Sequence, residues 1–141
     1  MMVKIVSNQL SLRTAGSGDM KNITAEIQTV LNKTGLKNGT VTVFVIGSTA
    51  GLTTIEYEPG LKKDLNDAFE RVAPRSEYYE HSQRWGDDNG HSHVRASLLG
   101  PSLNVPFSQG TLELGTWQQI VLVDFDTHPR QREVILKFIG E

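Results

Sequence analysis

Three of the four histidines lie within a stretch of 13 residues, at His81, His91 and His93. The last two form a His-x-His pair, and in an extended segment residues i and i+2 project from the same face. Three neutral imidazoles, or two imidazoles and a carboxylate, are an ordinary ligand set for zinc and similar divalent ions. The spacing therefore predicts a divalent metal site, for zinc or magnesium, on these residues. The alternative is that they are solvated polar residues.

Arg95 and Ser97 continue the same alternation along a strand that we expect over residues 93–99. A guanidinium group offers planar, bidentate donors that suit phosphate and other anions. The pattern favours a polar site with Arg95 in its wall. The competing interpretation is a strand that simply faces solvent.

A run of small residues, Gly47-Ser48-Thr49-Ala50-Gly51, separates two strand-like segments. Small side chains let a ligand or another backbone approach closely, so Ser48 and Thr49 are candidate ligand contacts. The run is not a phosphate-binding P-loop, because the Gly-Lys-Ser/Thr ending is missing.

Two carboxylates beyond this run are candidates for a general base. Glu56 ends the next strand and Asp64 lies at the edge of the inward face of a helix, and their spacing does not choose between them. Gln118 falls on the strand face opposite Trp117 and is a further candidate ligand contact. The charged residues after that strand are interpreted as an ordinary turn with weak ion pairs, at Asp124, Asp126, Arg130 and Arg132.

The elements that must position these residues follow from hydrophobic periodicity. Helical spacing predicts one helix from Met20 that ends near Gly35, and a second that has Pro59 in its first turn and ends before Pro74. Alternating or continuous apolar runs predict strands over residues 3–13, 40–46, 52–57, 93–99, 103–107, 111–114, 117–125 and 132–139. Residues 74–92 show neither period. Two helices packed on six to eight strands predict an α+β fold with a largely antiparallel, mixed sheet or sandwich.

Two of the predicted strands, Thr40–Ile46 and Trp117–Phe125, are apolar on both faces. Two helices supply too little material to cover both faces of every strand. A closed cyclic assembly would bury the remainder, so we expect a homotrimer.

Length and composition limit the class of protein. The chain has 141 residues and a formal charge of −2, with no cysteine. This length fits one domain over residues 1–141, and the charge gives no electrostatic footprint for nucleic acid or an anionic membrane. No window approaches a membrane span. We expect neither a secretory signal in residues 1–14 nor a disulfide, which is compatible with a cytoplasmic protein.

Several segments together resemble the YjbQ-like family, once grouped as uncharacterised proteins. The resemblance runs from about Val41 to the C-terminus. The matching stretches are Ser48–Thr53 through Glu56, Asp64-Leu65, Tyr78–His81, Asp88–Gly100, Gly115–Gln118, Asp126 and Pro129–Arg132. The resemblance implies an α+β homotrimer with a polar pocket for a metal ion or an anion. It also implies a secondary thiamine-phosphate synthase activity, which joins a pyrimidine diphosphate to a thiazole phosphate. The pocket residues that it implies are Glu56, Asp64, His81, Asn89, His93, Gln118 and Arg130.

Two positions depart from the family pattern. Many members have a histidine where this chain has Gly47, and here His91 adds an imidazole in the loop, so we expect His91 to take over that place. The spacing from Asp126 to Arg130 is one residue longer than the common pattern.

Three functions remain open at this point. The first is an enzyme acting on a small phosphorylated or heterocyclic substrate. The second is a non-catalytic module that binds a small anion or metal ion. The third is that the histidines only support trimer packing.

Overall fold

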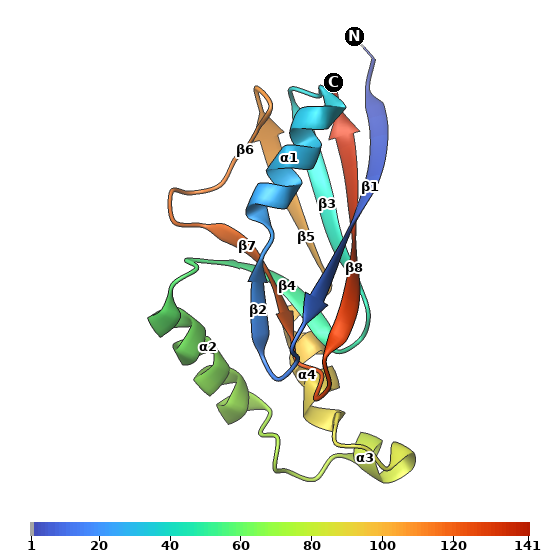
Figure 1. Cartoon of the computed structure of the whole chain (residues 1–141), viewed down its shortest axis with the longest axis vertical. Coiled ribbons are helices and arrows are strands. Elements are labelled where there is room, and N and C mark those ends of the chain that lie inside the picture. Colours follow the sequence, from blue (N-terminus) through green and yellow to red (C-terminus); the bar gives the residue numbers. More distant parts are fainter. Residues whose placement is uncertain (1) are drawn as a thin grey trace.

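The computed structural model describes residues 2–141, and its long strands form one five-stranded antiparallel sheet. The strand order is β1-β8-β3-β5-β6, so the first and last long strands pair side by side (Figure 1). The bounds are β1 Lys4–Thr14, β3 Gly39–Ile46, β5 Ser102–Ser108, β6 Thr111–Leu112 and β8 Arg130–Gly140. Each of these strands was predicted from an alternating or continuous apolar run.

A second, three-stranded antiparallel sheet crosses the lower half of the molecule in Figure 1. Its order is β2-β7-β4, with β2 at Asp19–Asn22, β7 at Gln119–Asp124 and β4 at Ala50–Ile55. The predicted start of the first helix is wrong, because Met20 lies in β2 and pairs with Val123. The helix α1 begins at Thr24 and runs to Thr34. Gly35 ends it in a left-handed conformation, as predicted.

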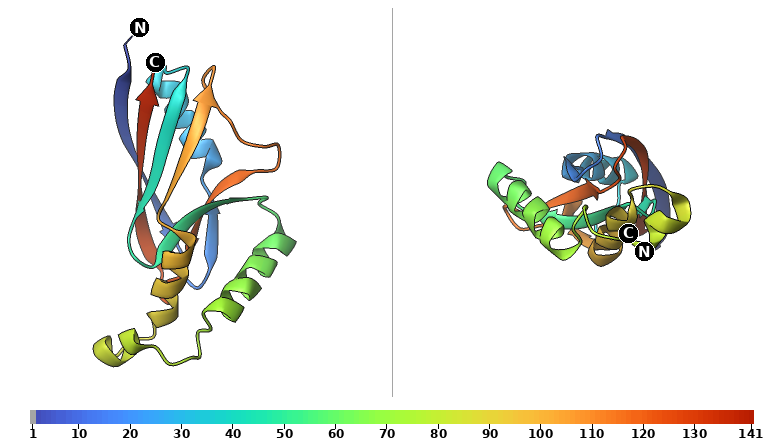
Figure 2. Two further views of the ribbon diagram at one scale, coloured as in Figure 1. Left: turned by 180° about the vertical axis from the view of Figure 1, so that it is seen from behind. Right: turned by 90° about the horizontal axis from the view of Figure 1, so that it is seen from below.

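The main core lies between the two sheets and α1 (Figures 1 and 2). Ile27 and Leu31 of α1 are fully buried. They join a cluster that includes Val43 of β3, Leu136 of β8 and Leu122 of β7. These side chains recur at helical or alternating spacing, so hydrophobic burial places the sheets and α1 together.

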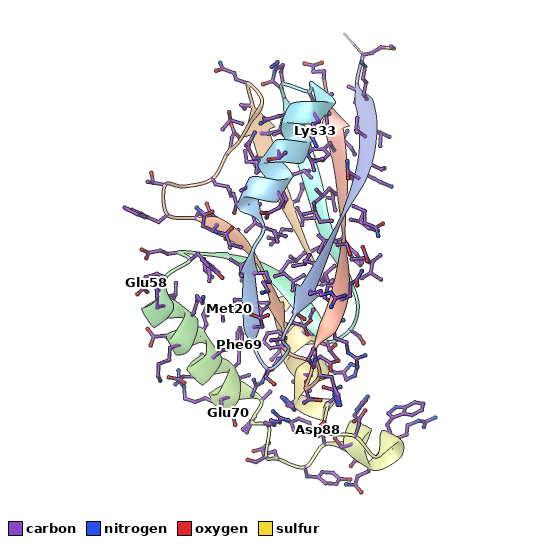
Figure 3. All side chains as sticks on the ribbon, viewed as in Figure 1. Met20, Lys33, Glu58, Phe69, Glu70 and Asp88 are labelled. Carbon is purple, nitrogen blue, oxygen red and sulfur yellow. The ribbon has the colours of Figure 1, made fainter. Side chains whose placement is uncertain are left out.

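A smaller core lies on the other face of the second sheet, under helix α2, Pro59–Val72. Pro59 occupies the first turn of α2, and the Glu58 carboxylate accepts hydrogen bonds from the backbone N–H groups of Gly60 and Leu61 at 2.8 and 2.7 Å. Figure 3 shows Met20 and Phe69 between β2 and α2. The Phe69 ring meets Phe125 edge to face, with 4.8 Å between the ring centroids.

The two strands predicted to be apolar on both faces differ in how many of their faces are buried. Strand β7 is buried on both faces, with Leu122 in the main core and Val123 in the smaller one. Strand β3 is buried on one face only, because Phe44 and Ile46 are exposed on the outer face of the large sheet. The expectation for β3 is therefore wrong for the chain taken alone.

Two further helices occupy the segment after residue 79, at the end of the molecule opposite the two chain ends (Figure 2). Helix α3 spans Glu80–Trp85 and helix α4 spans Gly90–Leu99. The strand predicted over residues 93–99 is wrong. The α+β class with antiparallel sheets is confirmed, with four helices in residues 2–141 in place of the two predicted. Within the same residues, no helix combines the length and the apolar character that crossing a membrane requires.

Candidate functional site

A polar cleft of about 630 Å³ lies where α3 and the first turn of α4 meet the loop after β3 and the start of β8. We call it the histidine–arginine cleft. The predicted site residues that line it are Ser48, Thr49, His81, Asn89, His93 and Arg130. The volume falls in the range of small-molecule sites.

Two imidazoles stand together in the histidine–arginine cleft. The ring centroids of His81 and His93 lie 4.3 Å apart and the rings are tilted by 43°. His81 Nδ1 lies 3.3 Å from Asp87 Oδ1 but is buried without an aligned hydrogen bond. Burial and the neighbouring His81 lower the pKa of His93. The His93 imidazole is therefore biased toward its neutral form, which can accept a proton or bind a metal.

The third predicted metal ligand, His91, does not lie in this cleft. It is only 3% exposed and its ring packs near Tyr79, with 6.4 Å between centroids. Residues i and i+2 of a helix point roughly 200° apart, so the His-x-His pair is divided between two faces of α4. The structure does not bring His91 to the place next to Gly47.

The orphaned Nδ1 of His81 and the adjacent His93 fit two positions of a metal ligand set. In residues 2–141, however, no three histidine, aspartate or glutamate side chains are arranged to hold an ion. A divalent ion at this place would need ligands from another molecule in addition to the two imidazoles.

The other two members of the predicted strand face are also separated by helix geometry. Ser97 lies one turn after His93, and its hydroxyl donates to the His93 carbonyl at 2.8 Å. Arg95 lies one turn after His91 and is buried. Its guanidinium donates to the Ala73 carbonyl at 3.0 Å and to Glu70 at 2.6 Å. Arg95 therefore ties α2 to α4 and is not part of the cleft wall.

A buried ion pair forms the floor of the histidine–arginine cleft. Asp124 is fully buried, and Arg132 donates to its two oxygens through Nε at 2.7 Å and Nη2 at 2.9 Å. The Thr14 hydroxyl donates to the same carboxylate, and Arg132 Nη2 also reaches the Thr49 hydroxyl at 2.6 Å. Strand β8 thus delivers a guanidinium group in a fixed orientation.

A second pair lies beside the first. Asp126 is 3% exposed and its carboxylate lies 3.2 Å from Arg130 Nε. Burial alone would raise the pKa of Asp126, but hydrogen bonds from the His128 N–H, the Thr49 hydroxyl and Arg130 lower that pKa to about 2. Arg130 and Arg132 are residues i and i+2 of one strand and share a face. Two guanidinium groups therefore line the same side of the cleft.

Two hydrogen bonds join the first turn of α4 to the segment between β7 and β8. The Ser92 hydroxyl donates to the Phe125 carbonyl at 2.5 Å, and the Asn89 side-chain oxygen accepts from the Thr127 N–H at 3.0 Å. Both side chains are buried. These bonds fix His93 in position relative to the arginines.

Three predicted site residues lie outside the histidine–arginine cleft. Glu56 is exposed beside a separate hollow that Trp117 also lines. Asp64 is exposed on α2. Gln118 donates to the Thr54 hydroxyl at 2.9 Å. Within one subunit the structure does not bring them to the two imidazoles.

Sequence reasoning missed half of the cleft wall. The residues that it did not assign to a site are Gly47, Trp85, Asp87, Asp126, Gln131 and Arg132. The available signal was two aspartates at alternate positions directly after the most apolar strand, followed by two arginines at alternate positions. Acids that follow a buried strand are easily buried themselves, and then need paired cations.

The fold and the cleft define a class of small α+β protein, built from two antiparallel sheets and carrying paired imidazoles and paired guanidinium groups in one cleft. A family model described as "UPF0047 protein YjbQ-like" matches residues 8–141. The chain belongs to this YjbQ-like family.

Similar proteins cover nearly the whole chain. A UPF0047 protein of Methanothermobacter thermautotrophicus is 34% identical over 99% of this chain and 95% of its own length. YugU of Bacillus subtilis is 35% identical over 93% of this chain and 97% of its own length. A solved structure from Sulfolobus solfataricus, described as a YbjQ-like protein of unknown function, has a TM-score of 0.93 at 31% identity and covers 99% of this chain and 100% of its own. The solved structure of a Clostridium acetobutylicum protein of the family has a TM-score of 0.85 at 32% identity. It covers 93% of this chain and 98% of its own.

Proposed function

We propose that this chain is a cytoplasmic protein that binds a small phosphorylated ligand in the histidine–arginine cleft. The observation that carries the proposal is the pairing of His81 and His93 with Arg130 and Arg132 around one cavity of about 630 Å³. Guanidinium groups are well matched to phosphate oxygens. A neutral imidazole can accept a hydrogen bond from the rest of the ligand.

A second hollow supports a ligand larger than a simple anion. It has a volume of about 240 Å³ and shares Gly47, Ser48 and His93 with the histidine–arginine cleft. Its other walls include Ala96 and Pro101, which are apolar. We assign the phosphate to the arginine side and a small heterocyclic ring to this hollow, since a flat ring packs well against apolar side chains.

We further propose that a divalent ion, zinc or magnesium, enters together with the phosphorylated ligand. His81 and His93 would supply two ligands and phosphate oxygens the remainder. A bound ion would neutralise phosphate charge. Magnesium or zinc should therefore raise the affinity for a diphosphate in the parent protein and have no such effect in a His81→Ala, His93→Ala double variant.

Thiamine-phosphate coupling is the second candidate function. Two adjoining hollows favour it, because that reaction brings a pyrimidine diphosphate and a thiazole phosphate together. Arg130 and Arg132 would stabilise the charge on the departing diphosphate. The placement of Glu56 and Asp64 outside the cleft favours the binding module over the enzyme.

We also propose that the protein assembles as a homotrimer. The support is the uncovered outer face of the large sheet, where Ile5, Phe44, Ile46 and Ile139 are between 41% and 67% exposed. Several large apolar side chains exposed on one sheet face are typical of association surfaces.

The proposed binding function is tested by calorimetric titration with hydroxymethylpyrimidine diphosphate. His93→Ala and Arg130→Ala should each weaken binding by about tenfold or more, because each removes a direct contact. Asp64→Asn, on exposed α2, is the matched control and should bind as the parent does. Equal affinity in the parent and both cleft variants would refute the proposal. Product formation with the thiazole phosphate added, measured on the same samples, separates the enzyme from the binding module.

A further inference from the structure

One guanidinium nitrogen of Arg132 is free. The Nε group and Nη2 of this side chain are used by Asp124 and Thr49. Within residues 2–141, Nη1 donates to no acceptor, and it is not among the buried polar atoms that lack a partner. Arg132 lines the histidine–arginine cleft together with Gly47, and its Nη1 is the atom that lies beside Gly47.

Arg132 Nη1 stays accessible because Gly47, which lies beside it, has no side chain. A Cβ atom built on Gly47 would stand 2.5 Å from Arg132 Nη1, which is closer than any Cβ contact tolerates. The backbone at Gly47 also has a φ of 148°, a conformation that residues with a side chain rarely adopt. Any side chain here would cover the nitrogen or displace it.

Asp124 orients this donor without blocking it. Both oxygens of Asp124 are engaged, by Arg132, by the Thr14 hydroxyl and by the Asp126 N–H. The guanidinium plane is therefore fixed by a bidentate pair, and the two N–H bonds of Nη1, beside Gly47 in the cleft wall, remain unpaired. Arg130, two residues earlier on the same strand face, is half exposed beside it.

We infer that Gly47 and Arg132 together form the phosphoryl-binding subsite of the cleft, with Gly47 as the residue that determines access to it. This inference rests on the proposed binding function and names the group that recognises the phosphate. The ligand class is a terminal phosphate or diphosphate, whose tetrahedral oxygens fit between Arg132 Nη1 and the guanidinium of Arg130.

The test is titration of inorganic pyrophosphate, without divalent ions, into the parent protein and two glycine variants. Gly47→Ala should weaken binding by about tenfold or more, since the methyl group covers the charged donor. Gly110→Ala is the matched control. It also carries a methyl group at positive φ, 76°, but lies beside Lys37 and should bind as the parent does. Equal affinity in parent and folded Gly47→Ala would overturn the inference.

A second measurement needs no folded Gly47 variant. In protein labelled with nitrogen-15 arginine, pyrophosphate should shift the guanidinium resonances of Arg132, identified by their loss in Arg132→Lys. A shift confined to Arg130 would overturn the inference while leaving the proposed binding function intact. No binding of pyrophosphate by the parent protein, in either the absence or the presence of magnesium, would instead contradict the proposed function itself.

Discussion

Asp124 and Asp126 hold the cleft arginines in different environments. The carboxylate of Asp124 is fully buried and paired with Arg132 through two hydrogen bonds. Removing one partner of a buried ion pair leaves an uncompensated charge, which costs about 3–5 kcal/mol. Asp124→Ala should lower the free energy of unfolding by about 3 kcal/mol or more, measured by urea denaturation.

The double variant Asp124→Ala, Arg132→Met is the control for that prediction. It removes both charges, so it should lose less stability than Asp124→Ala alone. A double variant that is less stable than the single one would contradict the explanation that a stranded charge on Arg132 causes the loss.

The lowered pKa of Asp126 predicts how the free energy of unfolding depends on pH. Its pKa in the folded protein is about 2, below the ordinary value of 3.8. A carboxyl whose pKa is lowered by folding stabilises the protein above its unfolded pKa, and this contribution is lost as pH falls from about 4 toward 2. The shift corresponds to about 2 kcal/mol. Asp126→Asn should reduce the loss of stability in that interval by this amount, measured by denaturation at several pH values.

The control for acid dependence is Asp64→Asn, which removes an exposed carboxyl on α2. It should leave the pH profile of the parent protein almost unchanged. A parent-like profile in Asp126→Asn would contradict the assignment of this dependence to Asp126.

At the scale of elements, α4 shows where sequence reasoning fails. Apart from Gly90, its buried positions are His91, Ser92, Arg95 and Ala96, which recur at helical spacing. Three of these four side chains are polar, so the buried face carries no hydrophobic signal and the alternation of charged and apolar residues mimics a strand. Tertiary hydrogen bonds such as Ser92 to the Phe125 carbonyl satisfy those polar groups. No local sequence pattern predicts these hydrogen bonds.

Helix α2 was predicted close to its observed bounds, because Pro59 begins it and an apolar stripe continues to Val72. Its packing depends on Phe69, which meets Phe125 edge to face. Phe69→Ala should lower the free energy of unfolding by about 2 kcal/mol, since a half-buried ring is removed from the smaller core.

Val72→Ala is the matched control on the same helix. Val72 is 65% exposed, so its truncation should change the unfolding free energy by about 0.5 kcal/mol or less. Equal losses from the two variants would mean that Phe69 does not anchor α2.

At the scale of the whole molecule, the sheets were predictable and the cleft only partly so. Alternating or continuous apolar runs located β1, β3, β5 and β8, and one face of each packs on the core. The cleft combines segments from residues 47–49, 81–93 and 126–132, and their meeting depends on long-range pairing of β3 with β8. Residue types indicated His81 and His93, but only the fold separates His91 from them.

The uncovered sheet face makes a prediction about assembly. A trimer should have a mass of three times 15.6 kDa by light scattering. Phe44→Glu places a charge on the exposed apolar face and should shift the mass toward one subunit. Leu98→Glu, on an exposed position of α4, should not. A parent mass of one subunit at micromolar concentration would contradict the trimer.

The central claim is that a phosphorylated ligand binds between the paired imidazoles and the paired arginines. The most direct test follows the nitrogen-15 resonances of all four histidines while hydroxymethylpyrimidine diphosphate is added to the parent protein. The account predicts that His81 and His93 shift together and saturate, while His91, which is buried beside Tyr79, and His128, which does not line the cleft, stay unchanged. Saturable shifts of His91 without His93, or no shift of either cleft histidine, would contradict it.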